Sequence, residues 1–182
     1  MHPRITELLD FVDRERQGLR QAVDSVPSER RDVSPGPDRW SVAGVLEHLA
    51  ILEVRVAALL RSRVAEARAA GVGQETDASP ILATMNLGGF GDRRTRLQAG
   101  DVMRPTGMDA NTAWDALEAA RRDFRNAVIE ADGVALADVM HPHRVFGPIN
   151  LYQWIGFTGA HEARHADQIR EIGEQLATAQ AS

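Results

Sequence analysis

Hydrophobic residues recur at helical spacing along most of the chain, and polar residues fill the positions between them. In the first segment the apolar positions form one stripe, made of Ile5, Leu8, Leu9, Val12, Leu19 and Val23. Pro3 suits the first turn of such a helix. Residues 25–37 contain three prolines. The first helix is therefore predicted to end before them.

A second stripe begins after Ser41, whose side chain suits a helix N-cap. From there to about Ala70 the stripe consists of Val42, Val45, Leu49, Leu52, Val56, Leu59 and Leu60. Gly71 and Gly73 follow and favour a helix end. The spacing predicts a long second helix, with Trp40 packed against its start.

Residues 71–108 are less regular. Residues 71–80 are predicted to form a loop, residues 80–87 a short helix, and the Gly-Gly-Phe-Gly run at 88–91 a bend. This connection is too long for a simple turn between neighbouring antiparallel helices. The second and third helices are therefore expected to run parallel, joined by a long crossover.

Two further helices are predicted. The third starts at Asp109 or Thr112 and ends at Ala131, and its core candidates are Trp114, Leu117, Phe124 and Val128. Residues 141–150 hold two prolines and a glycine, so a loop is predicted there. The fourth helix spans about 151–177, with Trp154 in the core. The predicted fold is an all-α four-helix bundle, with residues 1–182 forming a single domain.

Composition and charge exclude several functions. The net charge of −5 argues against a nucleic-acid-binding surface. The chain has no cysteine, which excludes disulfides, zinc–cysteine sites and a cysteine nucleophile. Any thiol chemistry must therefore use a thiol from outside. Apolar runs are too short for a membrane span and no signal-peptide pattern is present, so the expected location is the cytoplasm.

Residues 161–165 form the motif H-E-x-x-H. His161 and His165 lie four residues apart on one helix face, bordering the apolar stripe, and two such imidazoles can bind one divalent ion. His48 lies near the edge of the stripe of the second helix. Three inward-facing histidines would leave an open coordination position, as in catalytic metal sites. The alternative is that each is an ordinary core histidine, bound by a carbonyl or a carboxylate.

The motif does not predict a zinc protease. Its extended form needs a glycine and a histidine where this chain has Gln168 and Glu171. Glu171 and Glu174 also point away from His165 on the helix, so neither can complete the site. Glu162 is interpreted first as a surface charge of the helix. Its alternative role is catalytic, as a proton carrier near the metal.

Two segments resemble the DinB-like (YfiT-like) family of metal-dependent enzymes. Residues 39–53, RWSVAGVLEHLAILE, are similar to its motif W-S-x-x-x-x-x-x-H-[LI]-x-x-x-E. Residues 141–172 are similar to H-P-x-F-G…W-x-x-F-x-x-x-H-x-x-R-H-x-x-Q-I, with one extra residue near Arg144 or Val145. Together the segments cover about a quarter of the chain, in the order and separation of the family.

The resemblance implies a four-helix bundle that holds a divalent metal ion, nickel or zinc, through His48, His161 and His165. It also implies a thiol-dependent transferase, in which a low-molecular-weight thiol attacks a small electrophile, and a homodimer. Two alternatives stay open: a hydrolase on the same ion, or a non-catalytic metal-binding stress-response protein. His141 matches the histidine of the family's H-P pair and is interpreted as part of a helix-entry turn, while His143 is assigned no role.

Overall fold

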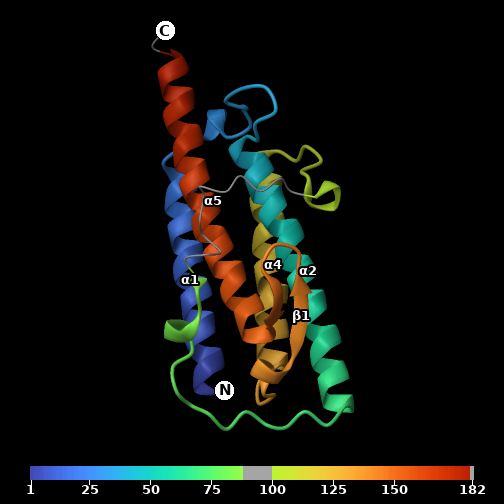
Figure 1. Cartoon of the computed structure of the whole chain (residues 1–182). Coiled ribbons are helices and arrows are strands. Elements are labelled where there is room, and N and C mark those ends of the chain that lie inside the picture. The colour runs from blue at the N-terminus through green and yellow to red at the C-terminus, as the bar shows by residue number, and fades with distance from the viewer. Residues whose placement is uncertain (88–99, 181–182) are drawn as a thin grey trace.

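The computed structural model describes residues 1–87 and 100–180, and of Asp101 and Gln180 only the backbone. Four long helices form most of this part of the chain (Figure 1). They are α1 (Pro3–Asp24), α2 (Val42–Ala69), α4 (Ala110–Glu130) and α5 (Leu151–Gln180). In the described residues no helix combines the length and apolar character that crossing a membrane requires.

The helices form a bundle in which α1 and α5 run in one direction and α2 and α4 in the other (Figure 1). Because α2 and α4 are parallel, the chain between them must return along the bundle. The predicted crossover is thus confirmed. It contains two short 3-10 helices in the described residues, η2 (Leu82–Thr84) and η3 (Asp101–Met103). The predicted bend at 88–91 lies outside the described residues.

The predicted helix starts are confirmed by their capping contacts. Ser41 caps α2 by accepting a hydrogen bond from the Gly44 N–H, at 3.2 Å. Asp109 caps α4 by accepting from the N–H groups of Asn111 and Thr112. Pro3 occupies the first turn of α1. The fourth helix continues beyond its predicted end, to Gln180.

The segment predicted as a loop at 141–150 instead forms most of a β-hairpin. Its antiparallel strands are β1 (Met140–His143) and β2 (Gly147–Asn150), with Pro142 opposite Pro148. In a two-stranded ribbon each strand is an edge, where proline is tolerated. Gly147 follows the turn with φ 72°, a left-handed conformation that glycine adopts without strain. The loop prediction was wrong because both prolines were expected to exclude regular secondary structure.

The core consists of two separate apolar clusters. One surrounds the first half of α1 and the second half of α2, and includes Leu8, Leu60, Phe124, Tyr152 and Ile155. The other surrounds the opposite halves of these helices, and includes Leu19, Leu46, Leu49, Leu117 and Ile169. Two further 3-10 helices, η1 (Ser28–Arg30) and η4 (Leu136–Asp138), lie in the connections.

Candidate metal centre

The three histidines predicted as metal ligands converge in the structure. One ring nitrogen from each of His48, His161 and His165 lies within 4.8 Å of the other two. The Nε2 atoms of His161 and His165 are 3.3 Å apart. Two nitrogens bound to a tetrahedral metal at about 2.0–2.1 Å would lie about 3.3 Å from each other. The pair on α5 therefore already has the separation that one shared ion requires.

His48 is held in one orientation by the segment that leads into α4. Its Nδ1 lies 2.8 Å from the Met103 carbonyl oxygen. Because a carbonyl only accepts, Nδ1 carries the hydrogen and Nε2 keeps a lone pair. This is the arrangement that orients most metal-binding histidines. The Trp40 ring packs against the imidazole, with 4.9 Å between ring centroids. Trp40 therefore lies at the start of α2 as predicted, and also touches the site.

His165 has a similar partner on its own helix. Its Nδ1 lies 2.7 Å from the Gln168 side-chain oxygen, so Nε2 again keeps its lone pair. His161 differs, because its Nδ1 is buried and has no hydrogen-bond partner among the described residues. Leaving a buried polar atom unpaired costs about 1–3 kcal/mol. Without a shared cation or proton, the facing nitrogens of His161 and His165 would also repel each other.

Burial favours the neutral form of two of these imidazoles, His48 and His161. It lowers the pKa of His48, although the hydrogen bond to Met103 acts in the opposite direction. Burial also lowers the pKa of His161 well below its usual value, and the neighbouring His165 and His48 add to this effect. The neutral form is the one that binds a metal. The residues present therefore fit a divalent ion of the kind that imidazole ligands hold, such as zinc or nickel.

Glu47, next to His48, binds the segment 106–108 that leads into α4. Its buried carboxylate accepts hydrogen bonds from the N–H groups of Thr106, Gly107 and Met108 and from the Thr106 hydroxyl. Burial raises the pKa of Glu47, but these hydrogen bonds outweigh it, and the net pKa lies below the usual value. Glu47 and His48 thus fix residues 103–108 to α2.

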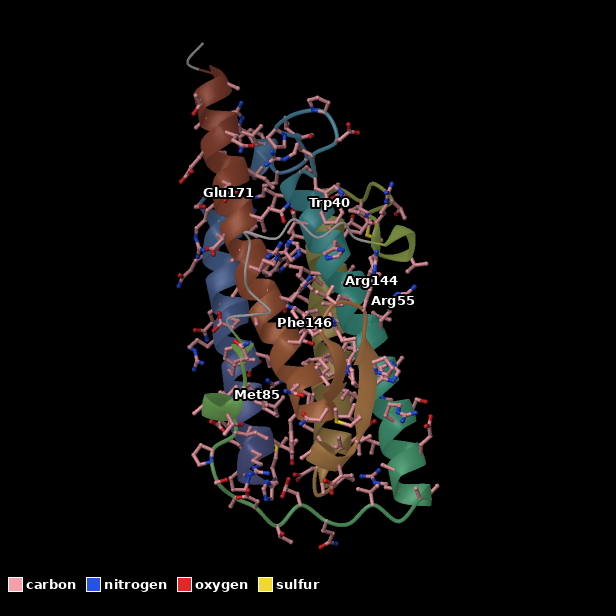
Figure 2. The ribbon with its side chains drawn as sticks, viewed as in Figure 1. Trp40, Arg55, Met85, Arg144, Phe146 and Glu171 are labelled. Carbon is pink, nitrogen blue, oxygen red and sulfur yellow. The ribbon has the colours of Figure 1, made fainter. Side chains whose placement is uncertain are left out.

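The hairpin borders the histidine cluster on another side through aromatic contacts. Two residues of its turn, Arg144 and Phe146, are labelled in Figure 2. His143 Nδ1 accepts from the N–H groups of Val145 and Phe146, at 3.2 and 3.3 Å. Its ring lies 4.7 Å from that of Phe157, which lies 5.2 Å from the ring of His161. Aromatic rings therefore connect the hairpin to the cluster. His141 packs on Trp154, which donates to the His141 carbonyl.

Glu162 is not the surface charge that we expected first. Its side chain is 1% exposed, and both carboxylate oxygens are bound by Arg16 and Arg121. Burial raises the pKa of Glu162 to about 7, although Arg121 and Arg16 favour its ionised form. The surface interpretation was therefore wrong. Its proposed role as a proton carrier stays a prediction.

Three kinds of contributor to the site were not predicted from the sequence. The Met103 carbonyl is a backbone group, and its residue type carries no signal. The sequence did contain a signal for Gln168, because a residue three positions after His165 lies on the same helix face as that histidine. Arg16 and Arg121 are charged residues at apolar positions of their helices, which predicts a buried ionic contact.

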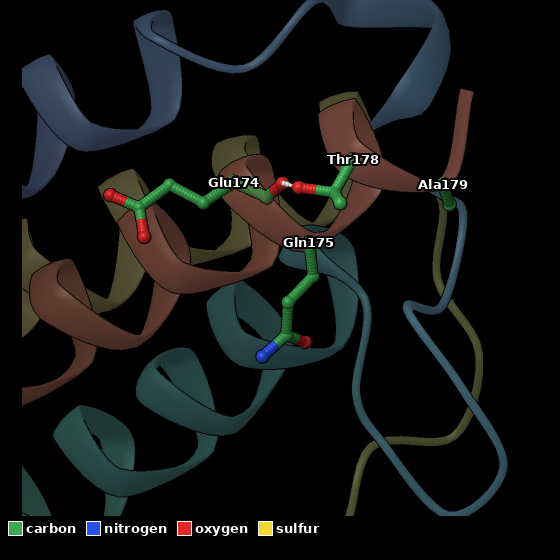
Figure 3. Close-up of a pocket in the computed structure, with 4 residues that line it drawn as sticks. All are labelled: Glu174, Gln175, Thr178 and Ala179. Atoms are coloured by element: carbon green, nitrogen blue, oxygen red, sulfur yellow. Dashed lines mark hydrogen bonds between the residues drawn. The ribbon is translucent and has the colours of Figure 1, made fainter. Parts of the chain in front are cut away.

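A surface hollow lies elsewhere on α5, towards its C-terminal end (Figure 3). Its lining residues are Glu174, Gln175, Thr178 and Ala179. The Thr178 hydroxyl donates to the Glu174 carbonyl, at 2.9 Å. Glu174 is about 13 Å along the helix from His165. The hollow is therefore separate from the histidine cluster, and the candidate chemistry of the chain belongs to the cluster.

Comparison with known proteins agrees with this fold and identifies the family. The chain is 26% identical over 150 residues to the uncharacterized protein YuaE of Bacillus subtilis (strain 168), which covers 81% of this chain and 86% of that protein. The fold of this chain is similar to that in the crystal structure of TT2238, a four-helix bundle protein, with a TM-score of 0.61 and 18% identity. The match covers 92% of this chain and 98% of the TT2238 chain. Residues 12–169 match the DinB superfamily, and the chain is a member of it.

Proposed function

We propose that this protein is a metal-dependent transferase that joins an external low-molecular-weight thiol to a small electrophile. The observation that carries the proposal is the cluster of His48, His161 and His165, which contains only neutral nitrogen donors. An ion bound there keeps its full double positive charge and lowers the pKa of a thiol that binds to it. Since the chain has no cysteine, the thiol must come from outside.

The surrounding residues supply orientation and an apolar boundary. Met103 and Gln168 hold two of the imidazoles with their lone pairs facing the cluster. Trp40 and Phe157 place aromatic rings against His48 and His161. In the proposed reaction the thiolate sulfur forms a bond to an electrophilic carbon. The bond to the leaving group breaks, and that group departs with the electron pair, as chloride does from an activated aryl chloride.

The first experiment measures metal content by mass spectrometry on protein purified without an affinity tag. We expect about one ion per chain in the wild type and a loss of it in His165→Ala. His141→Ala is the matched control, since it removes a histidine outside the cluster and should keep the ion. If the wild type binds neither nickel nor zinc when both are offered, the metal site and the transferase proposal fail together.

The second experiment separates a transferase from a hydrolase. The metal-loaded protein is mixed with an activated aryl chloride and with an aryl ester, each with and without cysteine, glutathione or 2-mercaptoethanol. We expect metal-dependent consumption of the chloride only when a thiol is present. Ester cleavage without thiol would instead support a hydrolase, and no turnover of either would favour a non-catalytic metal-binding protein. Homodimerisation stays a prediction, which light scattering can test.

A further inference from the structure

A buried layer of four charged side chains crosses the bundle, with one residue from each long helix. These are Arg16 of α1, Glu53 of α2, Arg121 of α4 and Glu162 of α5. Their side chains are 11%, 0%, 6% and 1% exposed, respectively. The layer contains two positive and two negative charges. It lies between the two apolar clusters of the core, because each residue occupies the middle of its helix.

The four side chains form a closed ring of ion pairs. Arg16 contacts Glu162 at 2.7 Å and Glu53 at 2.9 Å. Arg121 contacts the same two carboxylates, Glu53 at 2.6 Å and Glu162 at 2.5 Å. Arg121 also donates to the Val12 carbonyl at 2.9 Å. Every carboxylate oxygen in the ring is bound by an arginine, so a shift of one helix would disturb contacts to two others.

Such a layer is a poor source of stability. Removing charges from water costs several kcal/mol per ion, and replacing a buried ion pair by apolar residues of similar volume is often neutral or stabilising. Directional, paired contacts instead hold the helices in a single relative position. An apolar layer would tolerate small rotations and slips of one helix against another, whereas directional arginine–carboxylate contacts, such as the bidentate pair of Arg121 with Glu53, do not.

The ring connects the two helices that carry the histidine cluster. Glu162 directly follows His161 and precedes His165 by three residues on α5, while Glu53 follows His48 by five residues on α2. Successive residues of a helix are about 100° apart, so Glu162 points into the bundle while His161 faces His48. Arg16 and Arg121 bridge Glu162 to Glu53. They therefore join α5 to α2 close to the ligands.

We propose that this layer is a positioning device for the metal site. It fixes the rotation and register of α5 against α2, so that the nitrogens of His161 and His165 stay within reach of His48. The inference rests on the proposed metal site and adds a role for Arg16, Glu53, Arg121 and Glu162. None of the four contacts the ion in this proposal. Glu162 acts through the two arginines.

The sharpest test replaces Arg16 by lysine, which keeps the charge. Arg16 reaches Glu162, Glu53 and Glu118 with three different nitrogens, which a single ammonium group does not reproduce. The probe is Co²⁺, whose visible absorption reports its affinity and coordination geometry. We expect Arg16→Lys to remain folded and to bind Co²⁺ about 10-fold more weakly, with an altered spectrum.

Arg61→Lys is the matched control. Arg61 also bridges two carboxylates, Asp123 at 2.7 Å and Glu130 at 3.0 Å, but these ion pairs join α2 to α4 at the surface and do not involve α5. We expect its Co²⁺ affinity and spectrum to equal those of the wild type. Melting temperatures of both variants are measured in parallel, so that a general loss of stability is visible as such.

A second variant removes the whole ring: Arg16→Met, Glu53→Leu, Arg121→Met and Glu162→Leu together. We expect a melting temperature equal to or above that of the wild type and a similarly weakened Co²⁺ affinity. If this variant does not fold, Arg16→Lys decides alone. Wild-type affinity in folded Arg16→Lys overturns the positioning role and leaves the metal site standing. Absence of Co²⁺ binding by the wild type overturns both.

Discussion

At the scale of single residues, the most informative groups are buried polar ones whose partners lie far away in the sequence. Glu75, in the connection after α2, accepts hydrogen bonds from the Arg4 guanidinium at 3.0 Å and from the Tyr152 hydroxyl at 2.9 Å. Its side chain is 7% exposed. Burial raises the pKa of Glu75, but the hydrogen bonds from Asp77, Tyr152 and Arg4 outweigh it, and the net pKa is lowered.

The lowered pKa predicts how Glu75 contributes to stability. A carboxylate with a depressed pKa stabilises the folded state above its unfolded pKa, here 4.5, and the contribution is lost as the pH falls through the folded pKa. We expect Glu75→Gln to lower the free energy of unfolding by about 1–3 kcal/mol at pH 7. Urea unfolding from pH 7 to pH 3 should show the difference from the wild type narrowing below about pH 4.5. A constant difference would contradict the prediction.

The histidines of the candidate metal centre could be chosen from the sequence because their spacing and helix face are local properties. His161 and His165 share a face through the four-residue spacing alone. The partners of Glu162 could not be chosen in the same way, since Arg16 and Arg121 come from other helices. A signal existed nonetheless. Arg16 lies four residues after Val12 and three before Leu19, which places a charge on the apolar stripe.

At the scale of elements, α1 and α5 approach each other closely at a glycine. A Cβ atom added to Gly159 would lie 2.6 Å from Cε1 of Phe11 and 3.2 Å from Cγ1 of Val12. Gly159 is two residues before His161, so the two lie about 200° apart around α5, on nearly opposite faces. Helix propensity alone would favour alanine at this position by about 1 kcal/mol. The glycine is therefore explained by packing.

The close approach predicts opposite effects for the same substitution at two sites. Gly159→Ala is expected to lower the free energy of unfolding by about 1–2 kcal/mol, because the overpacking at Phe11 exceeds the gain in propensity. Gly18→Ala, on α1, should instead raise it by about 0.5–1 kcal/mol, since no atom lies within 4 Å of the added Cβ. Denaturant unfolding measures both. Stabilisation by Gly159→Ala would show that α1 and α5 pack less tightly than the 2.6 Å approach to Phe11 indicates.

Helices were predicted more completely than the connections between them. Caps such as Ser41 and Asp109 identify a start from local chemistry. The hairpin was missed because prolines break most strands, and only the pairing of Pro142 with Pro148 shows that each occupies an edge. That pairing depends on the turn between the strands. This turn contains Arg144 and Val145, where the chain has one residue more than the family's motif. Loop chemistry alone does not determine it.

At the scale of the whole molecule, the histidine cluster joins distant parts of the chain. His48 lies on α2, whereas His161 and His165 lie on α5, and these helices run in opposite directions. An unfolded chain keeps only the local pair, so it offers two ligands where the fold offers three. A ligand that binds the folded state preferentially raises its stability by mass action. Metal binding should therefore stabilise the entire bundle.

The size of this effect follows from linkage. A free metal concentration 100 times the dissociation constant stabilises the folded state by about 2.7 kcal/mol. For a chain of this size, that corresponds to a rise of about 5–10 °C in melting temperature. The measurement is thermal unfolding followed by circular dichroism, with nickel or zinc present and then with excess chelator.

His48→Ala tests whether the stabilisation requires the third ligand. This variant keeps the histidine pair on α5 but removes the ligand on α2. Because two ligands bind an ion more weakly than three, we expect added metal to raise its melting temperature by less than about 2 °C. His141→Ala, with the cluster intact, should retain the full shift. An equal shift in His48→Ala would mean that the ion binds α5 alone. The three-histidine site would then be wrong, even though its nitrogens lie close enough to share an ion.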